Sequence, residues 1–305
     1  MRLPPMTAAI VLALLSLIAG LLTLRAQDAR PAPAPTLRVD GSGFVLDFFF
    51  PNLRQGTAGL LRLTGDVQAA QAVFLRQEVP FYRAADGWYG WLVADLDSLA
   101  REYPLSLLVL GADGQVRTLE TRVLVTSGDY IRQNFVVPSE RAYLISPEIE
   151  RYEYARLSAW MSQTSPVPLW SETGFRAPLD TPLSARFGDF RILNESVQTR
   201  HTGSDHGVPV GTPVAAMASG RVVYAGVLDI RGGYVMIDHG WSVFSGYAHL
   251  SQVNVRVDDV VQAGQIIGAS GNSGRSSGPH LHWEVAVNGE WVDGPSFLSL
   301  WLPVR

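Results

Sequence analysis

All six histidines of the 305-residue chain lie after residue 200, at positions 201, 206, 239, 249, 280 and 282. The first opens the segment His-Thr-Gly-Ser-Asp at 201–205, and the last two belong to His-Leu-His at 280–282. Histidines that only filled a core would be scattered along the chain, so this clustering indicates a functional site. Imidazole nitrogens and carboxylate oxygens bind Zn²⁺ at about 2.0–2.2 Å, and a catalytic zinc has three such protein ligands and a water.

His201 and Asp205 have the spacing and chemistry of two metal ligands. Gly203, together with the prolines and glycines that follow, favours a turn rather than a helix for this segment. His280 and His282 precede an apolar run that is typical of a strand, and residues two apart in a strand share a face. One of these two histidines can therefore bind the metal while the other lies beside the metal-bound water. The residues alone leave open which does which.

These motifs resemble the lysostaphin-type (LytM-like) zinc endopeptidases, which cut peptide bonds in bacterial peptidoglycan. The resemblance runs from about residue 175 to 295 and includes His-x-Gly-x-Asp, Tyr-Ala-His-Leu at 247–250 and Gly-Pro-His-Leu-His at 278–282. It implies one Zn²⁺ per chain with His201, Asp205 and His282 as its ligands. It also implies that His249 and His280 are the catalytic pair. His206 and His239 lie outside the pattern, and we expect both to be structural.

The predicted ligand set has a chemical consequence. One carboxylate and two imidazoles leave Zn²⁺ with a net positive charge, so it can polarise a carbonyl and lower the pKa of bound water toward ~7. A neighbouring imidazole, with an ordinary pKa near ~6.5, is suited to proton transfer at neutral pH. The predicted function is zinc-dependent hydrolysis of peptidoglycan stem peptides or cross-bridges. The alternative is a non-catalytic relative that acts as a scaffold or activator of other cell-wall hydrolases.

Composition excludes several other classes of protein. The chain has no cysteine, which excludes disulfides, thiolate metal sites and cysteine nucleophiles. A formal net charge of -4 and the lack of a basic run argue against a nucleic-acid partner. The sequence has no lysine, so the glycine- and valine-rich segments at 208–226 and 260–268 cannot be a lysine-linked biotinyl or lipoyl carrier.

The N-terminus reads as a targeting segment. A short basic start is followed by an apolar run from Thr7 to Leu24 that bears no charge until Arg25. Such a run is either a signal peptide or a membrane anchor, and the absence of a clean cleavage site favours an uncleaved anchor. We therefore expect an exported protein of the cell envelope, held near the membrane through this segment if it is not removed.

The rest of the chain is predicted to be mainly β. Short apolar runs separated by turn residues, including an Asp113-Gly114 hairpin turn, favour a β-sandwich, and the glycine-punctuated C-terminal part favours a compact antiparallel sheet. Between them Ser146, Pro147 and Glu148 predict a helix start. The apolar residues after it, Ile149, Tyr152, Leu157, Trp160 and Met161, approximate one helical stripe. This helix either packs against both flanking domains or covers the active-site groove as a lid.

The predicted organisation has five parts. These are a signal peptide or anchor with a hydrophobic helix (1–27), a Pro/Ala-rich linker (28–36), an immunoglobulin-like β-sandwich (37–127), a helical connector (128–174) and the zinc peptidase domain (175–305).

Overall fold

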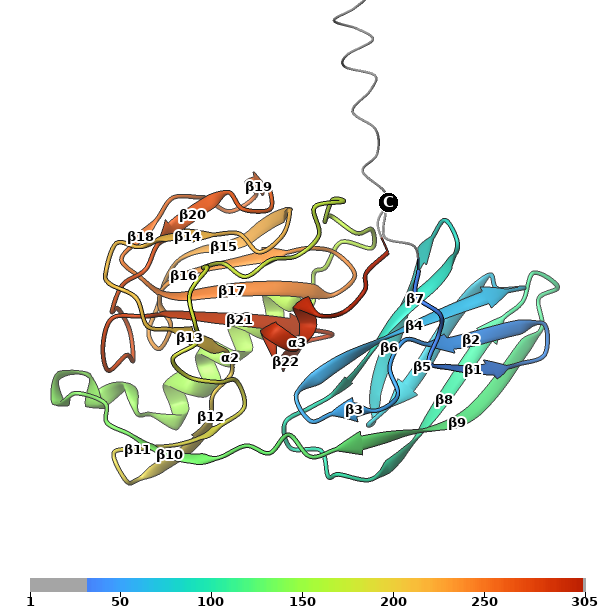
Figure 1. The fold of residues 1–305 in the computed structure, drawn as a ribbon, viewed down its shortest axis with the longest axis horizontal. Helices are drawn as coiled ribbons and strands as arrows, with labels where there is room; N and C mark the ends of the chain where they lie inside the picture. Colours follow the sequence, from blue (N-terminus) through green and yellow to red (C-terminus); the bar gives the residue numbers. More distant parts are fainter. Residues whose placement is uncertain (1–31, 304–305) are drawn as a thin grey trace, which may run out of the picture.

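The computed structural model describes residues 32–303 and consists mainly of β-strands in two large groups (Figure 1). The mainly β prediction is therefore confirmed. The predicted hydrophobic segment 1–27 lies outside the described residues. Within 32–303, no helix combines the length and the apolar character needed to span a membrane.

The N-terminal group is a path of nine strands in the order β1-β2-β4-β7-β6-β5-β8-β9-β3. Neighbouring strands are antiparallel except β3 and β9. The predicted Asp113-Gly114 turn joins β8 to β9, and Gly114 takes the positive φ of 76° that such a turn requires. The strands are β1 (Leu37–Asp40), β2 (Phe44–Phe48), β3 (Leu53–Arg54), β4 (Thr57–Gly65), β5 (Ala69–Phe74), β6 (Gln77–Ala84), β7 (Gly87–Ala94), β8 (Glu102–Leu110) and β9 (Val116–Thr126).

Strand β6 turns this path into a two-layer sandwich. Its first half pairs with β5 and its second half, from Phe81, pairs with β7. The side chains between the layers form an apolar core that includes Phe48, Leu63, Phe74 and Leu107. Alternation of buried and exposed residues along β8 and β9 supplies one wall of that core.

The connector contains strand β10 (Arg132–Phe135), the 3₁₀ helix η1 (Ser139–Leu144) and helix α2 (Pro147–Met161). The predicted helix start is confirmed, because Ser146 is the N-cap, its side chain accepts a hydrogen bond from the Ile149 amide, and Pro147 is the first helical residue. The predicted apolar stripe is only partly right. Leu157 and Met161 are buried with Glu153, whereas Tyr152 is 64% exposed.

The C-terminal group is built on a seven-stranded antiparallel sheet, in which β13-β21-β17-β16-β15-β19 form a path and β22 pairs with β21. Two three-stranded sheets flank it, β10-β11-β12 and β14-β20-β18. The strands are β11 (Phe190–Leu193), β12 (Val197–Arg200), β13 (Ser204–His206), β14 (Pro213–Ala215), β15 (Gly220–Leu228), β16 (Gly232–Asp238), β17 (Val243–Leu250), β18 (Gln252–Val253), β19 (Val260–Val261), β20 (Ile266–Ala269), β21 (Leu281–Val287) and β22 (Glu290–Val292).

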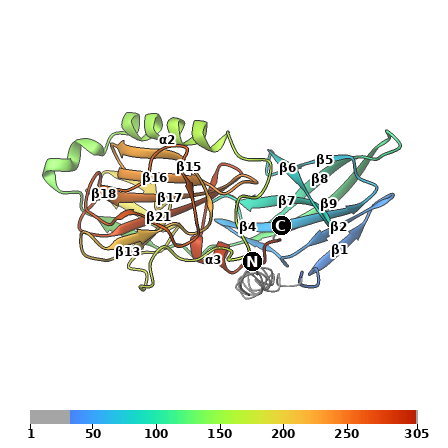
Figure 2. The ribbon, with the colours of Figure 1, turned by 90° about the horizontal axis from the view of Figure 1, so that it is seen from above.

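Helix α2 covers one face of the seven-stranded sheet. It lies behind the sheet in Figure 1 and above it in Figure 2. Leu157 and Met161 share an apolar cluster with residues of β16, β17 and β21, among them Ala286. Because residues two apart in a strand point to the same side, α2 covers the face that also carries Glu284 and His282.

The two groups of strands share a second apolar cluster. It contains Tyr89 and Trp91 of β7 and Trp241 of the C-terminal group. Tyr89 stacks on Trp241 with ring centroids 5.5 Å apart. Helix α3 (Gly294–Leu298) adds Phe297, whose ring centroid lies 5.8 Å from that of Trp91. This packing holds the sandwich against the sheet that carries the histidines.

Candidate metal centre

Strand pairing brings three of the predicted site residues together. Asp205 of β13 lies directly opposite His282 of β21, and His282 lies opposite Ala248 of β17. The turn before β13 brings His201 to the same place. Gly203 permits this close approach, because a Cβ at this position would lie 2.5 Å from the Trp283 carbonyl oxygen and 2.8 Å from His282 Cε1.

The donor atoms of these three residues converge. His201 Nε2 lies 2.9 Å from Asp205 Oδ1 and 3.0 Å from His282 Nδ1, and His282 Nδ1 lies 2.8 Å from Asp205 Oδ1. All three side chains are buried. Donors bound to one ion at about 2.0–2.2 Å lie close to one another in this way.

Outer hydrogen bonds fix which nitrogen of each imidazole faces the centre. His201 Nδ1 donates to the Arg186 carbonyl oxygen at 2.5 Å, and His282 Nε2 donates to Glu284 Oε1 at 3.2 Å. The inner nitrogens of the neutral rings therefore present lone pairs, next to a carboxylate oxygen. Three acceptor atoms within about 3 Å of one another require a cation between them. The residues thus fit a bound Zn²⁺.

The pKa shifts of Asp205 and His282 also indicate that the centre favours a positive charge. Burial alone would raise the pKa of Asp205, but His201 and His282 outweigh it and hold this pKa well below the usual range. Burial alone would lower the pKa of His282, but hydrogen bonds to Asp205 and Glu284 raise it. Two carboxylates therefore attract a proton or a metal ion to this position.

Arg191 of β11 holds the other oxygen of the aspartate. Its Nη2 lies 2.6 Å from Asp205 Oδ2, and both side chains are largely shielded from solvent. This charge-assisted hydrogen bond leaves Oδ1 free to face the two imidazoles. The guanidinium also lies over the ring of Phe135, 4.8 Å from its centroid, so β10 of the connector supports it. Sequence reasoning missed Arg191, because its partner lies on another strand.

His249 and His280 lie beside the group of three. Their ring centroids are 4.6 Å apart, and His249 lies 5.8 Å from the centroid of His282. His280 Nε2 is 3.7 Å from Asp205 Oδ1. His249 Nδ1 donates to the Ser273 carbonyl oxygen at 2.7 Å and His280 Nδ1 to that of Gly278 at 2.8 Å. Each ring therefore has Nε2 left for substrate or water.

Backbone conformation contributes to the placement of His249. Its φ is +60°, in the left-handed region that a residue with a side chain seldom adopts, near the end of β17. Its amide donates to the Arg231 carbonyl oxygen at 2.7 Å, which holds this conformation. Burial lowers the pKa of both His249 and His280, so both rings are neutral at neutral pH.

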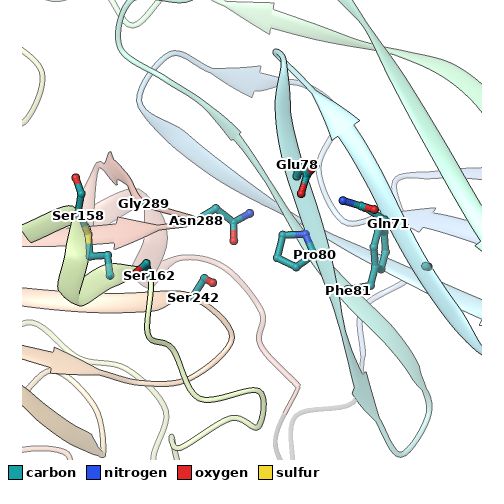
Figure 3. Close-up of a pocket in the computed structure, with 11 residues that line it drawn as sticks. Gln71, Glu78, Pro80, Phe81, Ser158, Ser162, Ser242, Asn288 and Gly289 are labelled. Carbon is teal, nitrogen blue, oxygen red and sulfur yellow. The ribbon is translucent and has the colours of Figure 1, made fainter. Parts of the chain in front are cut away.

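A cavity of about 140 Å³ opens beside the centre. Its lining includes His201, His249 and His282 and also Phe135, Glu150 and Tyr154 of the connector. A second cavity of about 730 Å³ lies between the sandwich and the C-terminal group. Figure 3 shows Gln71, Glu78 and Pro80 on one side of it and Ser242 and Asn288 on the other. None of the five predicted site residues lines this larger cavity.

His206 and His239 remain outside the centre. His206 Nδ1 lies 3.0 Å from Thr181 Oγ1. His239 is fully buried, with Nδ1 2.9 Å from the Ser219 carbonyl oxygen and Nε2 2.8 Å from Ser245 Oγ. These contacts agree with the structural role expected of both histidines.

The buried His239 is expected to make the stability of the fold sensitive to acid. Burial lowers its pKa to about 4, against 6.5 for an exposed histidine. As the pH falls below 6.5 the unfolded chain takes up this proton first, so stability present above pH 6.5 is lost toward pH 4. The expected loss is roughly 3 kcal/mol. Urea unfolding of the wild type and of His239→Asn, which keeps a donor for the Ser219 carbonyl, checks this. Parallel stability curves from pH 7 to 4 would contradict it.

Comparison with known proteins identifies this part of the chain. Residues 199–294 match the model of peptidase family M23. A peptidoglycan DD-endopeptidase of Vibrio cholerae, ShyA, is 44% identical over 121 residues, which cover 39% of this chain and 28% of that protein. Lysostaphin of Staphylococcus simulans is 46% identical over 90 residues, which cover 29% of this chain and 18% of that protein. The matched segments thus span less than a third of these two relatives.

A solved structure extends the likeness beyond this segment. A peptidase M23 from Pseudomonas aeruginosa superposes with a TM-score of 0.60 and 28% identity, over 82% of this chain and 95% of that one. The likeness therefore includes most of the N-terminal strands and the connector as well. The lysostaphin-type resemblance of the histidine motifs is confirmed, and the segment that holds the converging His, Asp and His side chains is a domain of peptidase family M23.

Proposed function

We propose that the chain is a zinc-dependent endopeptidase that hydrolyses peptide bonds in the stem peptides or cross-bridges of bacterial peptidoglycan. The observation that carries this proposal is the convergence of His201, Asp205 and His282 within hydrogen-bonding distance of one another, with two further imidazoles beside them. The names of the relatives, a peptidoglycan DD-endopeptidase and lysostaphin, supply the substrate class.

Each of the five residues has a part in the proposed reaction. His201, Asp205 and His282 would hold Zn²⁺, which supplies a Lewis acid for the scissile carbonyl and a water of lowered pKa. His249 and His280 divide proton abstraction and stabilisation of the developing oxyanion between them. Their Nδ1–H groups are engaged by carbonyl oxygens, so the free Nε2 of one ring takes up the proton from the attacking water. A ring donates to the oxyanion only once its Nε2 carries a proton.

The non-catalytic alternative is not favoured. A scaffold or activator has no need of the two imidazoles that lie beside the metal ligands. Here both rings are held by hydrogen bonds of 2.7 and 2.8 Å with Nε2 left free. A complete and oriented set of five side chains is what hydrolysis requires.

The proposal includes a location. Peptidoglycan lies outside the cytoplasmic membrane, so we propose that the protein acts in the cell envelope. The apolar run from Thr7 to Leu24 supports export, either as a signal peptide or as an anchor that keeps the protein at the membrane.

Removal and return of metal test the proposal. Purified sacculi incubated with the protein are expected to release soluble peptide fragments, to stop doing so when a chelator is added, and to resume when Zn²⁺ is restored. Mg²⁺ should not restore release, because it prefers octahedral coordination by oxygen atoms, whereas two of the three donors here are imidazole nitrogens. Release that is equal with and without chelator would contradict the proposal.

A further inference from the structure

One buried carboxylate of the connector has no part in the chemistry described so far. Glu153 of α2 is only 2% exposed, although it belongs to a helix that precedes the matched segment 199–294. A buried carboxylate is costly unless it is paired and hydrogen-bonded. Its partners therefore indicate why it is there.

Glu153 binds the loop between β15 and β16. Its Oε2 accepts a hydrogen bond from the Ile230 amide at 2.7 Å, and its Oε1 accepts one from Arg231 Nη1 at 2.8 Å. Both oxygens of the carboxylate are thus used, one by the backbone and one by a buried guanidinium. This arrangement fixes where the Arg231 side chain lies.

Arg231 in turn holds Glu284 with two parallel hydrogen bonds. Its Nε lies 2.8 Å from Glu284 Oε2 and its Nη2 lies 2.6 Å from Oε1. Thr202 and Tyr234 add hydroxyl hydrogen bonds of 2.7 and 2.9 Å to the same carboxylate. Bidentate pairing of this kind fixes the plane of the carboxylate as well as its position.

Glu284 is the outer partner of a predicted metal ligand. Its Oε1 accepts the Nε2–H of His282 at 3.2 Å, which sets the tautomer of that ring and directs Nδ1 toward Asp205 and His201. Outer partners of this kind orient a ligand and raise its basicity. A continuous series of contacts therefore runs from the connector helix to the metal ligands through Arg231 and Glu284.

We infer that Glu153 is a positioning residue of the metal centre, so that α2 is a structural part of the active site and not a lid that must leave it. The inference rests on the proposed zinc function. Glu153 acts on His282 only through Arg231 and Glu284, and it touches neither metal nor substrate. A lid would be expected to make contacts that break at little cost, whereas α2 shares a buried ion pair and an apolar cluster with the sheet.

Glu153→Gln tests the inference in the full-length protein. The amide keeps the size of the side chain but removes its charge and places an NH₂ group against one of two N–H donors, so either the Ile230 amide or Arg231 loses its acceptor and the hold on Arg231 weakens. Zinc affinity, measured by competition with a chromophoric chelator, is expected to fall about tenfold, at the lower end of the effect of losing an outer partner. Peptidoglycan hydrolysis should fall as well. Glu148→Gln, on the exposed first turn of the same helix, is the matched control and should bind zinc like the wild type.

The unfolding midpoint of the metal-free protein separates a positioning role from a merely structural one. A structural role lowers this midpoint and leaves the zinc affinity of the folded protein unchanged. If Glu153→Gln does not fold, Glu153→Asp replaces it, since it keeps the charge but is too short to reach both donors.

The outcomes are distinct. Zinc affinity of the Glu153 variant within twofold of the Glu148 control would overturn the inference and leave the proposed function intact. Increased hydrolysis by the variant would also overturn it, because that result is expected of a lid. A wild-type protein that binds no zinc would overturn the proposed function together with the inference.

Discussion

Replacing His282 by alanine is expected to abolish zinc binding and peptidoglycan hydrolysis together. His282 provides one of the three converging donor atoms and lies within 3.0 Å of the other two. Loss of an outer partner alone lowers metal affinity by roughly 10–100-fold, so loss of the ligand itself should lower it by more than about a hundredfold. Without the ion the substrate carbonyl is not polarised, and hydrolysis should fall to background.

The measurement is the zinc content per chain after dialysis, together with the rate of fragment release from sacculi. His206→Gln is the matched control, because His206 of β13 is buried like His282 but faces Thr181 instead of the centre. The control should keep one zinc per chain. A His282→Ala protein that retains zinc at the wild-type level would show that His282 is not a ligand.

Replacing His280 by alanine is expected to separate binding of metal from catalysis. His280 Nε2 is 3.7 Å from Asp205 Oδ1, beside the donor group but outside the three mutually close atoms. Zinc content and KM should stay near the wild-type values, while kcat should fall by about 10²–10⁴-fold, as for loss of a general acid or base. Zinc analysis and steady-state kinetics on a soluble cross-linked peptide check this. Loss of zinc in His280→Ala would contradict the assignment.

The start of a helix and the position of a turn could be predicted from the sequence, because neighbouring residues determine them. Ser146 and Pro147 start α2 where the sequence indicates, and the turn at Asp113-Gly114 joins β8 to β9. The apolar runs from Ser242 to His249 and from His280 to Val287 also predict the strands that carry the histidines, because β17 and β21 begin and end within one residue of these bounds.

The buried face of α2 could not be predicted in the same way. Glu153, Leu157 and Met161 are spaced by four residues and form one face of α2. A glutamate is ordinarily exposed to solvent, so the sequence gives no sign that Glu153 belongs to the buried face. Its partner Arg231 is 78 residues away in the sequence. Tyr152, which a stripe of apolar residues places inside, is exposed because Glu153 takes the buried position.

In the site, too, residues within short motifs could be predicted, whereas partners distant in the sequence could not. The five residues predicted from short motifs lie together in the structure. They could be predicted because each motif is recognised from residue types and spacings within a short segment of the sequence. Arg191 and Glu284 were missed as supports of Asp205 and His282, since nothing in their own segments indicates these partners. The contacts between the sandwich and the C-terminal group, such as Tyr89 on Trp241, also join segments far apart in the sequence. The predicted boundaries of the five parts stay predictions.

Identification of the broken bond is the sharpest test of the proposed endopeptidase activity. Soluble fragments released from purified sacculi by the zinc-loaded protein would be analysed by mass spectrometry after labelling of free amino groups. An endopeptidase should release fragments with a new amino terminus within a stem peptide or cross-bridge and no new reducing sugar, and we expect none of them with His280→Ala. Fragments with new reducing ends, or no fragments from any sacculus type despite one bound zinc, would contradict this activity.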